Sequence, residues 1–253
     1  EVVTIATGDA TYTRDLPGRV QAFRTAQVRA RVDGVIEQRL FKEGSDVTEG
    51  AQLFRIDSRS YRAAAEAANA DAALAYQNLE RAKRLLEIKA ISQQEYDLTL
   101  AKAAQARAAL VRANEDVTNA GVPAPISGHI GRTEVTEGAL VSKAAGTLLA
   151  TVEQLDPVYV NFSQSATDLL RLRQAVATGV LKRADATDGE LMLEDGSIYS
   201  RKGRIFFTDL AVDANTGSVS LRAQFPKPQR DLLPGMFVRL RFPEAMAENV
   251  IRV

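Results

Sequence analysis

The longest regular pattern of apolar positions lies between residues 58 and 120, where a four-three alternation is repeated. This stretch contains no Pro and no Gly, and it is rich in Ala, Leu, Gln, Glu, Lys and Arg, which are strong helix formers. The alternation is typical of the a/d seam of a coiled coil. The first seam consists of Tyr61, Ala65, Ala68, Ala72, Ala75, Leu79, Ala82 and Leu86, and the second of Tyr96, Thr99, Ala103, Ala106, Leu110, Ala113, Val117 and Ala120.

A break at residues 88–91 separates the two seams. Ser92 and Glu95 then form a capping-box pattern, which predicts the start of a second helix. Two arms of about 30 residues, each about 45 Å long, should pack as an antiparallel coiled-coil hairpin. The alternative is a hairpin folded back onto a domain core. A helix buried on several sides would need a wider apolar stripe, so the narrow seams favour a projecting arm.

Short apolar runs on either side of this insert form an internal repeat. Each half reads as short strands separated by glycine turns, and a half of this size cannot bury its own apolar face. Two such halves packed face to face would form a β-sandwich, whereas chance similarity of glycine-turn strands is the alternative. The equivalent positions are Gly34 and Gly128, Ile36 and Ile130, Glu43 and Glu137, Gly44 and Gly138, and Val47 and Val141.

Beyond residue 155 the pattern changes to several short strands and one helix. A strand is expected at 157–162, a capped helix from Ser165 to near Gly179, and a hairpin at 191–199 with an Asp-Gly turn. Further strands are expected at 203–207, 219–225 and 236–242. Together with residues 11–23 they predict a small antiparallel β-barrel. Hinge motion is expected at 23–29 and 152–157, where the chain passes between modules.

The predicted fold is therefore an elongated, multi-domain chain of mixed α and β structure. It combines a lipoyl-like β-sandwich made of two half-motifs, an inserted antiparallel α-helical coiled-coil hairpin, and a small antiparallel β-barrel. The expected parts are 1–10, a fragment of a membrane-proximal domain; 11–25, the first barrel strand; 26–57, lipoyl-like half 1; 58–120, the hairpin; 121–153, lipoyl-like half 2; 154–245, the barrel; and 246–253, the start of the membrane-proximal domain.

Composition excludes several classes of function. Lys plus Arg equals Asp plus Glu, which argues against nucleic acid as a partner. Cysteine is absent, so thiolate metal sites and cysteine nucleophiles are excluded. The single histidine, His129, is expected to be exposed on a turn, and one histidine rules out a multi-histidine metal site. No apolar run is long enough to span a membrane. The chain does not start with Met, which indicates a mature fragment.

Eight short motifs, in order along the chain, resemble those of the periplasmic adaptors, or membrane fusion proteins, of resistance-nodulation-division (RND) multidrug efflux pumps. They are LPGR (16–19), RLFKEGS (39–45), ISQQEY (91–96), PISGHIG (125–131), VTEGALV (135–141), QLDP (154–157), VDANTGS (212–218) and LLPGMFV (232–238). One stretch departs from the family, residues 119–123, where an aromatic and a basic residue usually stand. This departure weakens the prediction of where the next strand begins, but not the prediction of the fold.

The resemblance implies a non-enzymatic role without cofactor or metal. Such adaptors link a proton-driven transporter of the inner membrane to an outer-membrane channel, and they self-associate as a hexamer in the assembled pump. The resemblance also implies a periplasmic location, with anchoring to the inner membrane through a lipid outside this sequence. Three residues match those with which the family's hairpin contacts the channel: Arg81, Leu85 and Ser92. Ser92 could instead serve only as a helix cap, and Arg81 only as a solvated charge.

Three other functions remain as alternatives. The first is an adaptor of an ATP-driven or type I secretion exporter. The second is a lipoyl or biotin carrier, but the turn that would hold its modified lysine is replaced by the helical insert. The third is a hydrolase that uses Asp209, Asp213 or Glu194 with Asp195, although Asp in turns is commonly structural. Glu43 and Glu137, beside glycines, are expected to be solvated turn carboxylates.

Overall fold

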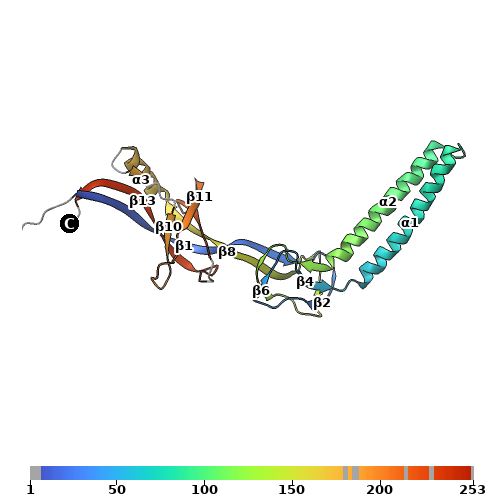
Figure 1. Ribbon diagram of the computed structural model, residues 1–253, viewed down its shortest axis with the longest axis horizontal. Coiled ribbons are helices and arrows are strands. Elements are labelled where there is room, and N and C mark those ends of the chain that lie inside the picture. Colours follow the sequence, from blue (N-terminus) through green and yellow to red (C-terminus); the bar gives the residue numbers. More distant parts are fainter. Residues whose placement is uncertain (1–6, 179–181, 184–187, 214–215, 228–230, 252–253) are drawn as a thin grey trace, which may run out of the picture. The chain divides into compact units, whose positions relative to one another are not determined.

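The computed structural model describes residues 7–178, 182–183, 188–213, 216–227 and 231–251. The chain divides into two compact units, one formed by residues Glu1–Thr25 with Glu153–Val253 and the other by Ala26–Val152. Two long strands, β1 (Thr7–Arg29) and β8 (Leu148–Ser165), contribute residues to both units (Figure 1). Both predicted joints, at 23–29 and 152–157, lie on these strands, and hinge motion there stays a prediction.

The unit Ala26–Val152 contains the two repeated halves, which exchange strands. Gly34 pairs with Val141, and Val47 pairs with Gly128, so each half contributes one strand to a pair with the other. The two pairs are equivalent under the sequence repeat. Chance similarity is therefore wrong, because the repeat corresponds to a structural two-fold. The strands are β2 (Gly34–Arg39), β3 (Asp46–Val47), β4 (Gln52–Ile56), β5 (Gly121–Pro123), β6 (Gly128–Thr133), β7 (Leu140–Val141) and the start of β8.

The core of this unit is filled from both halves. Ile36 and Ile130, equivalent in the repeat, are 1% and 0% exposed and belong to one apolar cluster. Gly44 and Gly138 are also equivalent, and their φ angles of +70° and +85° are left-handed conformations that glycine adopts at little cost. The equivalent glycines Gly34 and Gly128 instead begin β2 and β6.

The helical insert connects β4 to β5, two neighbouring antiparallel strands. Arg55 pairs with Gly121, and the Ile56 amide donates to the carbonyl of Ala120 at 2.8 Å, so the two ends of the insert are joined. β5 forms in spite of the unusual sequence at 119–123. The insert consists of α1 (Arg59–Glu87) and α2 (Gln93–Asn119), which pack against each other and extend from the strands of their own unit (Figure 1).

The predicted seams are confirmed residue by residue. All sixteen seam positions are buried or half-buried, whereas most other positions of the two helices are exposed. The fully buried seam residues within α1 and α2 are Ala72, Ala82 and Ala103. Their small side chains let the two backbones approach, but they bury little apolar area per residue.

The other unit contains a closed sheet. Its strand order is β1-β13-β10-β11-β12-β8, and β1 also pairs with β8, which completes a barrel. The core includes Val20, Val160, Phe225 and Leu240. The bounds are β9 (Lys182–Arg183), which pairs with β13, β10 (Asp188–Met192), β11 (Gly203–Val212), β12 (Ser218–Phe225) and β13 (Phe237–Ile251), with α3 (Ala166–Ala177) following β8.

The ends of the described chain belong to this sheet. β1 pairs with β13 from Arg19 opposite Phe237 to Thr7 opposite Ile251, so both strands continue through residues 10 and 246. The domain boundaries expected at those two positions stay predictions. The expected Asp-Gly turn is confirmed, because Gly196 follows Asp195 with φ +82° and the Leu193 amide donates to the Ser197 carbonyl at 2.9 Å.

Candidate functional site

The turn between α1 and α2 is a compact C-terminal cap. Ile88 caps α1, and Lys89 adopts a left-handed conformation with φ +55°. The Lys89 amide donates to the Leu86 carbonyl at 2.9 Å, and the Ala90 amide donates to the Leu85 carbonyl at 2.8 Å. These are the two hydrogen bonds of a Schellman motif, in which glycine usually occupies the position of Lys89. Lysine at this position therefore costs conformational energy.

Ser92 begins the second arm. Its backbone is extended, and its Oγ accepts a hydrogen bond from the Glu95 amide at 3.2 Å. The capping role predicted for Ser92 is therefore confirmed. Glu95 also places a negative charge in the first turn of α2, where it complements the helix dipole. The Ser92 side chain remains exposed, and its contact with a partner stays a prediction.

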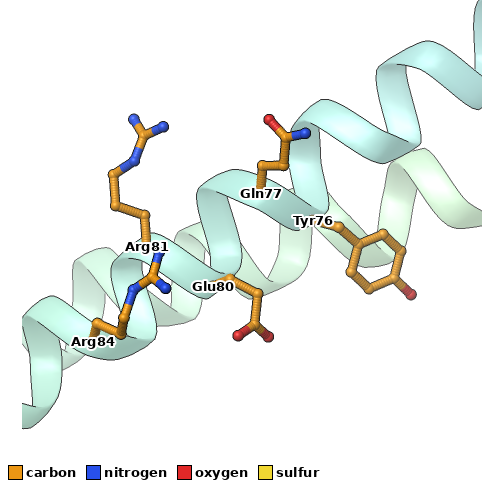
Figure 2. A pocket seen from close by; sticks show the side chains of 5 residues that line it. All are labelled: Tyr76, Gln77, Glu80, Arg81 and Arg84. Carbon is orange, nitrogen blue, oxygen red and sulfur yellow. The ribbon is translucent and has the colours of Figure 1, made fainter.

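Arg81 and Leu85 lie one helical turn apart near the end of α1. Arg81 is exposed and lines a shallow hollow on α1, and Figure 2 shows its guanidinium pointing away from the helix. In the described part of the chain, no side chain forms an ion pair with Arg81 or accepts a hydrogen bond from it. Leu85 is half-buried. The hollow is lined by Tyr76, Gln77, Glu80, Arg81 and Arg84.

This end of the hairpin is basic. Between Arg81 and Ser92 there are four basic residues and one acidic residue, Glu87. The basic residues all come from α1 and the turn. Such a surface favours a partner that presents carboxylates or free carbonyl oxygens.

The base of the hairpin is fixed by polar contacts. The Tyr61 hydroxyl donates to the backbone carbonyl of Asp33 at 2.6 Å. The Arg59 Nη2 lies 2.6 Å from Asp57 Oδ2, and the Arg59 amide also donates to Asp57. These hydrogen bonds lower the pKa of Asp57 to about 2, with the Arg59 side chain as the main cause. The first arm is thus attached to the sandwich through Tyr61.

Two glutamates connect the repeated halves. Both are exposed, as predicted for turn carboxylates, and each also accepts a hydrogen bond from the other half. Glu43 Oε1 accepts from the amide and the hydroxyl of Thr133 at 2.8 and 2.6 Å. Glu137 Oε1 accepts from the Arg39 amide at 2.9 Å, which is the equivalent bond under the two-fold. The Thr133 hydroxyl is the main cause of a lowered pKa at Glu43. The repeat places both glutamates at equivalent positions, but it does not indicate which residues they bind.

A second pair of equivalent contacts joins the same two halves. Asp33 Oδ1 accepts from the Lys143 amide at 2.8 Å, and Ser127 Oγ accepts from the Glu49 amide at 2.8 Å. Hydrogen bonds to Ser142 and Lys143 lower the pKa of Asp33. The sandwich therefore has two symmetric sets of polar cross-links in addition to its apolar core.

His129, Asp195 and Asp213 form polar contacts with other residues of the fold. His129 lies on β6 and is only half-buried, with its Nδ1 3.1 Å from Asp46 Oδ1, so the prediction of an exposed histidine on a turn is wrong. Asp195 accepts hydrogen bonds from Ser197, and Asp213 accepts one from the Thr216 amide. Within the described ranges, no three metal-ligating side chains come together.

The side chain of the third hydrolase candidate, Asp209, lies outside the described residues. In the part of the chain that the structure describes, no helix is both long enough and apolar enough to cross a membrane.

Comparison with known proteins gives the family. The profile for the barrel-sandwich hybrid domain of RND MFPs matches residues 24–153, and the profile for the β-barrel domain of RND MFPs matches residues 157–246. The antibiotic efflux pump periplasmic linker protein ArpA of Pseudomonas putida is 48% identical over 99% of this chain and 68% of its own length. The multidrug efflux pump subunit AcrA of Escherichia coli K12 is 45% identical over 100% of this chain and 67% of its own length.

A solved structure has the same fold. The crystal structure of a MacA–MexA chimera, containing the α-hairpin domain of Pseudomonas aeruginosa MexA, superposes with a TM-score of 0.81 at 22% identity, over 98% of this chain and 87% of that one. At this identity the likeness speaks for the fold alone. The chain spans about two thirds of the length of its curated relatives. The family profiles, together with relatives at 45–48% identity, show that this chain belongs to the RND membrane fusion proteins, the periplasmic adaptors of RND efflux pumps.

Proposed function

We propose that this chain is the non-enzymatic adaptor of a tripartite multidrug efflux pump. In this proposal it lies in the periplasm and connects a proton-driven RND transporter of the inner membrane to an outer-membrane channel. A lipid attached outside this sequence would hold the full-length protein at the inner membrane. Relatives named as periplasmic linkers and efflux pump subunits support this role over nearly the whole of this chain.

The observation that carries the proposal is the exposed turn of the hairpin. The arm is stabilised by its own seam, its base is fixed to the sandwich, and its far end presents the Arg81 guanidinium, to which the described side chains offer no acceptor. We propose that Arg81, Leu85 and Ser92 contact the end of the channel. Arg81 would donate to carbonyl or carboxylate oxygens, Ser92 would add a hydroxyl, and Leu85 would pack as an apolar group.

Self-association forms the second part of the proposal. Copies would stand side by side as a hexamer in the assembled pump. A shallow apolar groove between the two helices supports a lateral contact, because Tyr76, Leu100 and Val111 are exposed on it. Burial of these side chains against a neighbouring copy would add to the small stabilisation that the alanine seam provides.

Cross-linking in cells tests the channel contact. Residues 1–253 contain no cysteine, so Ser92→Cys is the single thiol within this sequence. We expect a cross-link to an outer-membrane channel in cells that also produce the transporter. Lys102→Cys, which is exposed in the middle of α2, is the matched control and should give no channel adduct. Absence of a channel adduct from Ser92→Cys, or equal adducts at both positions, would contradict the proposal.

A second experiment, which measures drug resistance, separates the alternative exporters. Deletion of the proton-driven transporter should abolish the drug resistance that the adaptor confers. Resistance that survives this deletion but is lost with an ATP-driven transporter would favour the adaptor of an ATP-driven exporter.

A further inference from the structure

The turn that leads into β13 is hydrogen-bonded to β1. Its central residues are Pro234 and Gly235, and Gly235 has φ +94°, as a type II turn requires. The Met236 amide donates to the Leu233 carbonyl at 3.2 Å across the turn. The Gly235 amide donates to the Val20 carbonyl at 2.8 Å, and the Val20 amide donates to the Met236 carbonyl at 2.9 Å. Since Val20 is 1% exposed on β1, the turn is attached directly at the barrel core.

The side chain of Met236 accepts a further hydrogen bond within this turn. Its Sδ accepts from the Leu233 amide at 3.2 Å, although a thioether is only a weak acceptor. The side chain is half-buried and packs against the apolar core cluster of the barrel. A small oxidant can therefore reach it from solution, and any oxygen added there would lie next to apolar side chains.

The hydrogen bond makes the two sides of the sulfur unequal. Oxidation of a methionine adds one oxygen atom to one of the two lone pairs of its sulfur. In Met236 one lone pair is directed at the Leu233 amide, whose nitrogen lies 3.2 Å away, whereas a nitrogen and an oxygen keep about 2.7 Å between them. An oxygen can be added on this side only after the hydrogen bond has broken. The two sides give the two sulfoxide epimers, so the folded protein should form one of them in excess.

We infer that Met236 is a site of reversible oxidation by hydrogen peroxide, which forms one sulfoxide epimer in excess and loosens the turn from β1. A sulfur lone pair attacks one oxygen of the peroxide, the O–O bond breaks, and the departing hydroxide takes the proton of the attached oxygen to become water. The sulfur is oxidised by two electrons and the peroxide is reduced. The resulting sulfoxide is polar and fits poorly against the apolar core cluster. A methionine sulfoxide reductase that matches the epimer, supplied with a thiol reductant, restores the thioether.

This oxidation site is independent of the proposed function, because its chemistry depends on the turn alone. The periplasmic location proposed above would place the turn in an oxidising compartment. There the sulfoxide would weaken the barrel of each oxidised molecule until a reductase repaired it.

Peptide mass spectrometry of the full-length protein after peroxide treatment tests the site. We expect one sulfoxide epimer of Met236 in roughly tenfold excess, as a single hydrogen bond can provide. The two classes of methionine sulfoxide reductase, each specific for one epimer, identify which one forms, and protein oxidised in urea should contain both in similar amounts. Met192 on β10 is the matched control, because it is also half-buried but has no hydrogen bond to its sulfur among the described residues. Equal epimers of Met236 in the folded protein, or an excess as large at Met192, would overturn the inference.

Hydrogen exchange tests the effect on the barrel. Oxidised protein should exchange the Val20 amide about tenfold faster, because its acceptor on Met236 is no longer held in place. Peptides from residues 26–152 should be unchanged, and the reductase should restore the parent rate. Met236→Leu keeps the apolar contact without a thioether, so its exchange should not respond to peroxide, whereas Met192→Leu should respond as the parent does. Unchanged exchange at Val20 after complete oxidation of Met236, or the same response in Met236→Leu, would overturn the inference, and the epimer ratio of the parent stands without any variant.

Discussion

The structural two-fold of the sandwich predicts that two distant substitutions have nearly the same effect. Ile36→Ala and Ile130→Ala remove equivalent side chains, which are 1% and 0% exposed in one apolar cluster. Their backbones also make equivalent bonds. The Gly138 amide donates to the Ile36 carbonyl at 2.8 Å, and the Gly44 amide donates to the Ile130 carbonyl at 3.1 Å. Each substitution should therefore destabilise the sandwich by a similar free energy.

The expected magnitude follows from burial. Isoleucine loses three carbon atoms on conversion to alanine, which costs roughly 2.4 kcal/mol in transfer free energy at about 0.8 kcal/mol for each buried carbon. The cavity left in a packed core adds about 1–2 kcal/mol, because the neighbours relax only in part. We expect a loss of about 3–4 kcal/mol for each variant, and a difference of under about 1 kcal/mol between them.

Hydrogen exchange read by mass spectrometry, at increasing urea concentration, measures this loss in peptides from residues 26–152 without interference from the other unit. The conservative variants Ile36→Val and Ile130→Val are the controls, with about 1 kcal/mol expected for each. A difference of more than about 2 kcal/mol between the two alanine variants would refute the equivalence of the two halves.

Two further predictions concern the cross-links and the seam. Hydrogen bonds to Thr133 and Arg59 lower the pKa values of Glu43 and Asp57. The ionised carboxylates therefore stabilise the fold fully above their unfolded pKa near 4, and this contribution is lost as the pH falls through the folded pKa, about 2 for Asp57. The melting temperature of the protein should fall between about pH 4 and pH 2, and it should fall less steeply in Glu43→Gln. Ala103→Leu, at a seam position that is 2% exposed, should destabilise the hairpin by about 1–3 kcal/mol through overpacking. Ala101→Leu on the exposed face should change its stability by less than about 0.5 kcal/mol in thermal unfolding followed by circular dichroism.

The hairpin could be predicted from the sequence because its determinants are local. A four-three pattern without Gly or Pro defines each helix, and Ser92 with Glu95 defines where the second one begins. The left-handed residue at the turn could not be predicted in this way. Lysine does not usually adopt this conformation. The sequence pattern therefore predicted a break at 88–91 but not the backbone conformation of the turn.

The repeat in the sandwich was predictable, but its cross-links were not. The spacing of glycines and isoleucines indicated two similar halves, whereas the bonds of Glu43 and Glu137 join residues 90 and 98 positions apart. Whether a turn carboxylate points to solvent or to another strand depends on strand exchange, which local patterns do not contain. His129 was misplaced for the same reason, since its neighbour Asp46 comes from the other half.

The same strand exchange determines how the arm is held. Asp33 accepts a hydrogen bond from Tyr61 of the first helix through its carbonyl and one from the Lys143 amide of the second half through its carboxylate. A single residue of the first half thus connects the hairpin base to the second half. At the other end of the insert, the Ala120 carbonyl accepts a hydrogen bond from the amide of Ile56 in the first half. Because an alanine seam buries little area, the orientation of the arm on the sandwich depends on these attachments at its base rather than on the seam.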